Sequence, residues 1–219
     1  MPRILFEKKG QAIWISHLDL MRLYQRAFKR AGLPLTHTHG FNPRPSVSIA
    51  LPLSVGVESE CELLDFTLDG VVHSNEEIKQ LLNQQLVDGI RVKDIYDNGR
   101  KIRDLSLLRC RIDLEYDQGA PVGTVSALEA LFQRNELILP KKTKNGIVDQ
   151  DILPMIRQLQ FTQTDPCTVT ADCLICCQNP ALNPSQISLA ITTFLPQYAP
   201  SFSRCQRLEV YDGEQTIFR

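Results

Sequence analysis

The sequence has no apolar run approaching the roughly 20 residues that a helix needs to cross a bilayer. Its first residues, MPRILFEKKG, become charged after a few positions and contain no signal-peptide core. We therefore expect a cytoplasmic protein that does not insert into a membrane. The seven cysteines are odd in number and unevenly spread, and no secretion signal accompanies them, so we expect reduced thiols rather than a disulfide framework.

Common catalytic motifs are missing too. The chain has no P-loop, G-x-G-x-x-G, G-x-S-x-G or H-E-x-x-H, which argues against nucleotide hydrolysis, dinucleotide chemistry and zinc-protease activity.

The cysteines Cys173, Cys176, Cys177 and Cys205 raise the question of a metal. C-x-x-C is a zinc-ligand spacing, but no second C-x-x-C follows, and the run CLICC is typical of a buried strand. The C-x3-C-x2-C spacing of a radical-SAM cluster also fails, because position 180 is Pro. We expect no metal and no other cofactor, while metal binding by these four cysteines stays open.

Charge is unevenly distributed along the chain, although the net charge is only −1. Residues 1–50 hold eight Lys or Arg against two acids, whereas residues 51–90 hold one Lys against eight acids. Segregation of this kind fits a basic face for an anionic partner. The alternative is that the two blocks neutralise each other within one fold.

The first half reads as alternating strands and helices. Ser16 with Asp19 resembles a capping box, and Gly32 and Pro34 are typical of a helix end. The expected elements are strands at 3–9 and 11–15, a helix from His17 to about Ala31, a hairpin of a strand from Ser46 and a strand at 61–69, a helix at 74–88 and a strand at 90–96. This order, β-α-β-β-α-β, is the ferredoxin-like arrangement.

The second half repeats this pattern after a linker at 97–104. The expected elements are strands at 105–116, 136–140, 167–177 and 204–212 and helices at 124–134 and 184–195, with 149–166 left open between helix and strand. The sequence therefore predicts an α+β protein of tandem ferredoxin-like domains, one at 1–98 and one at 104–219.

The basic helix and the loop after it form the most specific stretch. Arg22, Arg26 and Lys29 share one helical face, with Arg30 on its flank, and Arg can pair bidentately with phosphate. The loop adds hydrogen-bond donors, an aromatic ring and a guanidinium, from His37, His39, Phe41, Asn42 and Arg44. Single-stranded RNA is recognised by such stacking and edge contacts. The basic turn with Lys141, Lys142 and Lys144 resembles a second phosphate contact.

Histidines allow a catalytic alternative. His17, His37 and His39 could act as general acids or bases near neutral pH, as in a metal-independent endoribonuclease. No set of nucleophile, base and orienting group is visible, so we lean towards a protein without an activity of its own.

Several segments resemble a known bacterial family. They are F-E-K-K-G (6–10), S-H-L-D-L-M-R (16–22), R-A-F-K-R-A-G-L-P (26–34), G-F-N-P-R-P (40–45) and S-I-A-L-P-L-S-V-G-V-E-S (48–59), with weaker matches at K-K-T-K-N-G and D-Q-D-I-L-P (149–154). They resemble the radical-SAM-associated proteins, a domain of unknown function encoded beside, or fused to the C-terminal end of, a cobalamin-binding-type radical-SAM protein. The resemblance implies an accessory role to such an enzyme, and carries over no catalytic residue.

These observations leave three hypotheses. The first is an RNA-binding accessory protein of a radical-SAM enzyme, with tRNA or rRNA as its ligand. The second is the His-dependent endoribonuclease, and the third is a protein–protein adaptor that does not bind RNA.

Overall fold

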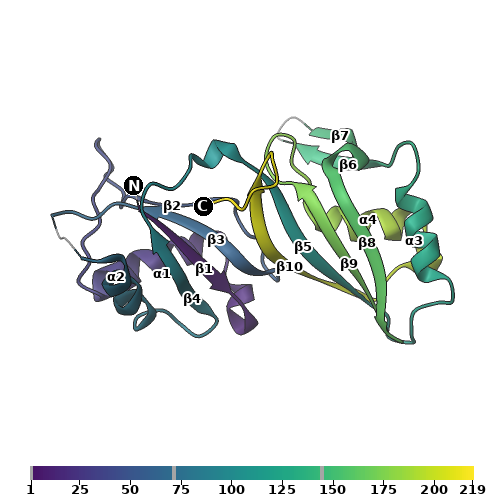
Figure 1. Cartoon of the computed structure of the whole chain (residues 1–219), viewed down its shortest axis with the longest axis horizontal. Coiled ribbons are helices and arrows are strands. Elements are labelled where there is room, and N and C mark those ends of the chain that lie inside the picture. Colours follow the sequence, from purple (N-terminus) through teal and green to yellow (C-terminus); the bar gives the residue numbers. More distant parts are fainter. Residues whose placement is uncertain (1, 71–72, 144–145) are drawn as a thin grey trace. The chain divides into compact units, whose positions relative to one another are not determined.

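The computed structural model describes residues 2–70, 73–143 and 146–219, with the side chains of Lys142 and Thr143 excepted. The chain divides into two compact units, residues 1–102 with Arg219 and residues 103–218. Helices and antiparallel strands make up both, which confirms the predicted α+β class (Figure 1). None of the helices in the described part is long and apolar enough to span a bilayer.

The described residues of the first unit form four paired strands and two α-helices. Strand β1 lies between β4 and β3, and β2 pairs with the other edge of β3, so the order is β4-β1-β3-β2 with antiparallel neighbours. Its elements are β1 (Arg3–Lys8), α1 (His17–Arg30), β2 (Val47–Ile49), β3 (Glu58–Phe66), α2 (Asn75–Asn83) and β4 (Ile90–Tyr96). The predicted hairpin of the second and third strands is thereby confirmed.

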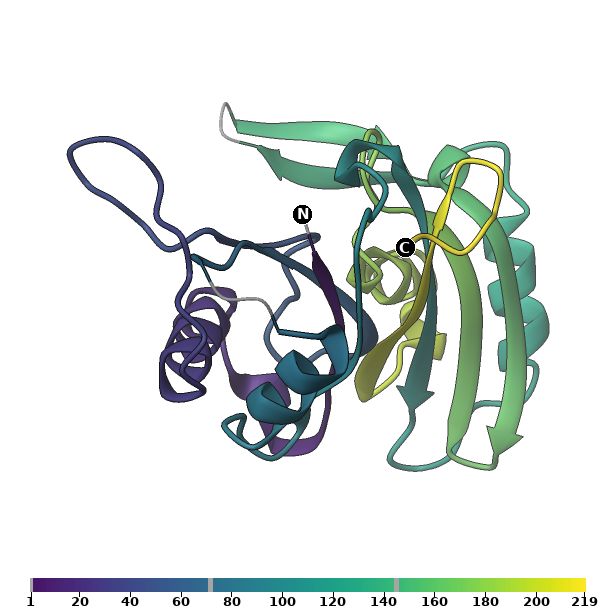
Figure 2. The same cartoon turned by 60° about the vertical axis from the view of Figure 1, so that its left-hand side comes forward.

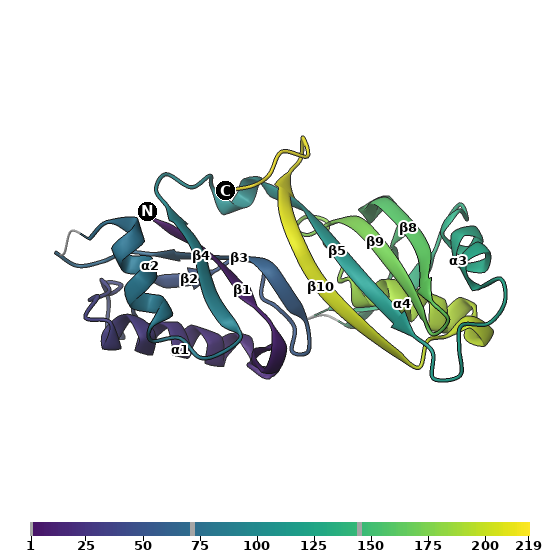
Figure 3. The same ribbon diagram turned by 60° about the horizontal axis from the view of Figure 1, so that its bottom comes forward.

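One face of this sheet packs against both helices (Figure 3). Phe6 of β1 meets Tyr24 of α1 edge-on, with 4.9 Å between the ring centroids. The ring centroids of Phe28 on α1 and Phe66 on β3 lie 5.1 Å apart, with the rings tilted by 43°. All four rings are fully buried, so they fix both the position of α1 on the sheet and its rotation about its own axis.

Both ends of α1 follow their predicted signals. The Ser16 hydroxyl accepts a hydrogen bond from the Asp19 N–H at 3.2 Å. At the other end Gly32 adopts φ +71°, its N–H donates to the Lys29 carbonyl, and the Leu33 N–H donates to the Phe28 carbonyl. These two bonds form a Schellman motif, which returns the chain to the core at the buried Leu33.

The segment predicted as a strand at 11–15 is instead the 3₁₀ helix Gly10–Trp14. The ammonium of the buried Lys8 donates to the carbonyls of Ile13 and Ile15, at 3.1 and 2.7 Å, and these bonds hold the turn. Hydrogen bonds from a buried ammonium to backbone carbonyls cannot be seen in the hydrophobic periodicity of a sequence. The alternation of apolar residues at 11–15 therefore predicted a strand wrongly.

The second unit has the same strand arrangement with one addition. Its sheet has the order β10-β5-β9-β8 with antiparallel neighbours, and β6 and β7 pair in a separate two-stranded sheet. The elements are β5 (Leu105–Glu115), α3 (Thr124–Phe132), β6 (Ile138–Thr143), β7 (Gly146–Asp151), β8 (Ile156–Asp165), β9 (Thr168–Cys176), α4 (Ser185–Phe194) and β10 (Phe202–Asp212).

The strand expected at 136–140 is therefore assigned to the wrong sheet. Its residues begin β6 of the hairpin, while β8, within the segment left open at 149–166, is the strand that pairs with β9. The register of β8 against β9 shifts between Ile156 and Gln158 and again between Gln163 and Asp165. Such irregularities break the period-2 pattern from which a strand is recognised.

Replacing Gly32 with Ala tests the turn that ends α1. Ala at φ +71° pays the left-handed penalty, so we expect a loss of about 1 kcal/mol or more in the free energy of unfolding, measured by urea denaturation. Gly213→Ala is the control, because its φ lies outside that region and its new Cβ would lie 3.8 Å from the Ser106 Oγ. Equal stability of the two variants would contradict the proposed role of Gly32.

Candidate nucleic-acid interface

The outer face of α1 carries the predicted cations. Leu20, Tyr24, Ala27 and Phe28 are buried against the sheet. Arg22, Arg26 and Lys29 are exposed, and their spacing of four and three residues stacks them along one side of the helix. The predicted basic face therefore exists on the folded unit.

Two of the four cations on α1 already have partners. The guanidinium of Arg22 donates to the Asp19 carboxylate at 3.0 Å. Arg30 donates to the backbone carbonyl and side chain of Gln85, just beyond α2, so it joins the two helices. Arg26 and Lys29 make no hydrogen bond or ion pair with any residue that the structure describes, which leaves both charges available to an external anion.

Asp19 moderates the charge at the N-terminal end of this face. A hydrogen bond from the Ser16 hydroxyl at 2.7 Å lowers the pKa of its carboxyl, and the Arg22 guanidinium lowers that pKa further. Asp19 is therefore ionised at neutral pH and offsets Arg22. The uncompensated charge lies towards the C-terminal half of the helix.

The loop after α1 is closed at its base. The Ser46 N–H donates to the Thr36 carbonyl at 2.8 Å, and the Thr38 N–H donates to the Arg44 carbonyl at 2.8 Å. The Arg44 N–H also donates to the Thr38 hydroxyl, and His37 and Pro45 form an antiparallel bridge. We call residues 36–46 the closed loop; Figure 2 shows it extending away from the rest of its unit.

The tip of the closed loop is fully open to solvent. His39, Phe41, Asn42 and Arg44 are all exposed, and Phe41 makes no buried contact at all. A large aromatic side chain held in water stabilises nothing within the folded unit. The predicted RNA-contacting residues of the loop are thus available to a partner.

A groove lies between α1 and the start of the closed loop. It has a volume of about 510 Å³ and is lined by residues that include Gln25, Phe28, Lys29, Leu35, His37 and Pro45. The groove brings together one cation of the helix and one histidine of the loop, two residues that were predicted separately. Leu35 and Pro45 make much of its surface apolar, above the buried Phe28.

His17 is remote from this groove. It is the first residue of α1, whereas Lys29 lies twelve residues further on, about 18 Å along the axis at ~1.5 Å per residue. His17 and His37 are therefore not brought together, and His39 lies beyond the groove on the loop. The described residues hold no arrangement of these three histidines around one reaction centre.

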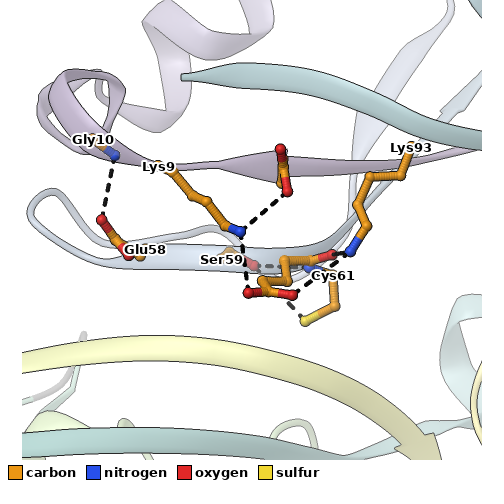
Figure 4. A network of polar contacts seen from close by, with 8 residues as sticks. Lys9, Gly10, Glu58, Ser59, Cys61 and Lys93 are labelled. Carbon is orange, nitrogen blue, oxygen red and sulfur yellow. Dashed lines mark hydrogen bonds and ion pairs between the residues drawn. The ribbon is translucent and has the colours of Figure 1, made fainter. Parts of the chain in front are cut away.

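Part of the basic block is neutralised by the acidic block, as the alternative interpretation of the charges holds. Arg3 pairs with Asp65 across β1 and β3, at 2.6 Å. Lys9 contacts Glu7 at 3.2 Å and Glu60 at 3.1 Å, in the network of Figure 4. These pairs involve Arg3 of β1 and Lys9 just after it, and they do not include the cations of α1.

The second basic feature belongs to the other unit. Lys141 lies on β6 and is half-buried, and Lys142 follows on the same strand. Lys144 lies outside the described residues, so the structure does not show whether the three lysines form one patch.

The four cysteines considered as metal ligands do not converge. Cys173 and Cys176 are three apart on β9, so their side chains leave opposite faces of the sheet. The thiol of Cys173 instead lies 3.1 Å from that of Cys110 on β5. The Cys110 thiol also makes a hydrogen bond with the thiol of Cys205 on β10, and all three cysteines are free thiols. Burial raises the pKa of the Cys177 thiol to about 12. Among the described residues no group of three or more metal-ligating side chains is suitably placed for a metal ion.

Two features were not foreseen from the sequence. Gln25 and Phe28 line the groove, and neither was among the residues predicted from the sequence. Trp14 is 63% exposed and Leu18 is 66% exposed, at the opposite end of α1 from the groove. Exposed apolar residues at a helix start carry no pattern that separates them from core positions.

Comparison with known proteins identifies a family but no activity. The model of a family described as "Uncharacterized protein conserved in bacteria (DUF2344)" matches residues 2–184. No curated protein matches the chain.

Two solved structures show low similarity. A chain of a structure titled "Crystal Structure of a Cbf5-Nop10-Gar1 Complex" is 9% identical, with a TM-score of 0.49 over 95% of this chain and 48% of that chain. The present chain therefore matches about half of the length of that chain. An unknown protein from Galdieria sulphuraria is 8% identical, with a TM-score of 0.26 over 94% of this chain and 96% of that chain. With both TM-scores below 0.5, no shared activity is inferred.

Replacing Arg22 with Ala tests how the cation controls Asp19. Loss of the guanidinium should raise the pKa of the Asp19 carboxyl towards its usual value near 3.9, observable by NMR titration. Any stability that this lowered pKa contributes is present above the unfolded-state pKa and is lost as the pH falls through the folded-state pKa. Lys79→Ala on α2 should leave Asp19 unchanged, and an unaltered Asp19 pKa in Arg22→Ala would refute the coupling.

Proposed function

The chain belongs to this uncharacterized bacterial family, and we propose that it is an accessory protein of a radical-SAM enzyme that binds RNA, with tRNA or rRNA as the ligand. The helix α1 holds phosphates, and the closed loop contacts bases. The proposal gives the chain no chemistry of its own.

One observation carries the RNA part of the proposal. Arg26 and Lys29 are exposed on one side of α1 and lack partners among the described residues, and the closed loop beside them ends in the exposed Phe41. Unpaired cations suit phosphate oxygens, and a solvent-exposed ring suits the face of an unstacked base. Neither the unpaired cations nor the exposed ring stabilises the isolated fold, and both can contact a nucleic acid.

The radical-SAM part rests on the segments quoted above, of which S-H-L-D-L-M-R and G-F-N-P-R-P are the most specific. Much of both segments lies at the surface: the first begins α1 and buries Leu20 in the core, and the second runs from the tip of the closed loop to its base.

We also infer that both units are ferredoxin-like domains. The support is the strand order β4-β1-β3-β2 in the first unit and β10-β5-β9-β8 in the second, with two helices in each. On this interpretation β6 and β7 are an insertion after α3 of the second domain. The match between these orders explains why a β-α-β-β-α-β pattern repeats along the sequence.

A charge-reversal pair tests the RNA-binding surface. Arg26→Glu/Lys29→Glu should weaken the binding of total tRNA or rRNA, and should flatten the fall of affinity with salt by about one unit of slope per lost contact. Lys79→Glu/Arg91→Glu makes the same change in net charge at α2 and β4 and should bind like the wild type. Equal affinities of the two variants, or no binding of RNA at low salt, would refute the proposal.

A protein–protein adaptor is the second candidate, and Trp14 favours it. Its ring lies beside Gly56, next to the half-exposed Val55, so that apolar side chains of two segments are exposed close together. Exposed tryptophans often anchor protein interfaces.

Trp14→Ala distinguishes the two candidates. In the adaptor function the variant should lose co-purification with the radical-SAM protein after nuclease treatment, while RNA binding stays at the wild-type level. Val122→Ala, at an exposed apolar residue of the other unit, is the control. Co-purification that depends on RNA and survives in Trp14→Ala would argue against the adaptor.

A further inference from the structure

We propose that the groove between α1 and the closed loop binds one unstacked nucleobase of single-stranded RNA. This inference rests on the proposed RNA-binding function and adds to it the class of RNA and the place where a base enters. The phosphate-binding helix face and the base-binding groove would then share Lys29.

The floor of the groove is built for a flat apolar face. Phe28 and Leu33 lie under the groove and are buried, so the apolar surface that a base can touch comes from Leu35 and Pro45, which flank them on the loop side and are partly exposed. A nucleobase presents just such a face when it leaves its stack, and aromatic and apolar side chains are its usual partners. The volume of about 510 Å³ is in the range of sites for small ligands.

The rim of the groove supplies a few polar groups. The amide of Gln25 can both donate to and accept from a base edge. His37 offers a ring for stacking and a nitrogen for hydrogen bonding, and the Lys29 ammonium can hold the attached phosphate. Apolar walls with a small number of polar groups are the usual composition of a ligand site.

Charge selects a nucleotide over an apolar peptide. Among the described residues, the groove lining contains Lys29 and His37 and no carboxylate, and Arg26 is one turn before Lys29 on the same side of α1. A peptide helix would leave both cations unpaired at the edge of its interface, whereas a base brings a phosphate to them. The observed charges therefore complement a polyanion.

The groove exists before any ligand binds. The Schellman turn at Gly32 places Leu33 in the core, and Thr36 is held to the end of β3 by the bond from its N–H to the Thr67 carbonyl at 2.9 Å. The bridge between His37 and Pro45 fixes the loop side. A preformed site avoids the entropy of ordering a loop on binding.

Two oligonucleotides separate base binding from phosphate binding. Fluorescence anisotropy of the full chain would be measured with an oligouridylate, and with an abasic ribose-phosphate oligomer of equal length, which has every phosphate and no base. Oligoadenylate and oligocytidylate serve as further base-bearing probes. We expect the wild type to bind at least one base-bearing oligomer about tenfold more tightly than the abasic one.

Variants then locate that preference. Gln25→Ala and His37→Ala should each bring the ratio of the two affinities close to one, and circular dichroism verifies that both fold. His73→Ala is the matched histidine control, since His73 lies near Glu77, before α2, and should retain the ratio. In addition, an oligomer with 4-thiouridine should photocross-link to the groove, within residues 25–37 or at Pro45.

The outcomes are distinct. Equal binding of base-bearing and abasic oligomers by the wild type, or a preference that survives in both groove variants, overturns the base-binding groove and leaves RNA binding by α1 intact. Absence of binding to every oligomer and to total RNA overturns the proposed function itself. Cross-links that map only to Phe41 and its neighbours at the loop tip overturn the groove as the site of the base.

Discussion

The two aromatic pairs beneath α1 fix the first unit in its working form. Phe6 with Tyr24 and Phe28 with Phe66 set the rotation of the helix on its sheet. A helix carries its faces at fixed angles, so this single constraint turns Arg26 and Lys29 outward and puts Phe28 under the groove. Phe28 is a core residue that supports the groove from beneath. Burial of the Phe28 ring also fixes where Gln25 and Lys29, its neighbours on α1, meet the groove.

The distribution of charge depends on local pairing more than on the counts along the chain. Cations of β1 lie in register with the acidic strand β3, and Arg3 meets Asp65 there. Cations of α1 stand on the far side of the helix layer, out of reach of those acids. Asp19 forms its ion pair with Arg22 and attracts Arg26 only from a longer distance, so positive charge remains where the closed loop begins. When a sequence holds two blocks of opposite charge, some of their charges can thus neutralise each other while others stay exposed, depending on the element that carries each residue.

Local signals predicted the bounds of α1 well, because the capping residues Ser16 and Gly32 act over a few residues. Interactions distant in sequence were beyond reach. The buried Lys8 that bonds to Ile13 and Ile15 turned a predicted strand into a 3₁₀ helix, and irregular register hid β8. Of the candidate site, the sequence supplied the cations and the loop residues. Gln25 and Phe28 lie beside those loop residues only because the chain turns back at Gly32.

The closed loop combines a fixed base with an unrestrained tip. Its closing bonds involve Thr36, Thr38, Arg44 and Ser46, whereas residues 39–43 contribute nothing to the core of the unit. The hydrogen-bonded base therefore restricts which residues can be substituted there. The tip tolerates substitutions and added residues, because lengthening an exposed loop costs little entropy. Homologous chains could exchange tips of different length and composition on one conserved frame, and so acquire different partners without redesigning the fold.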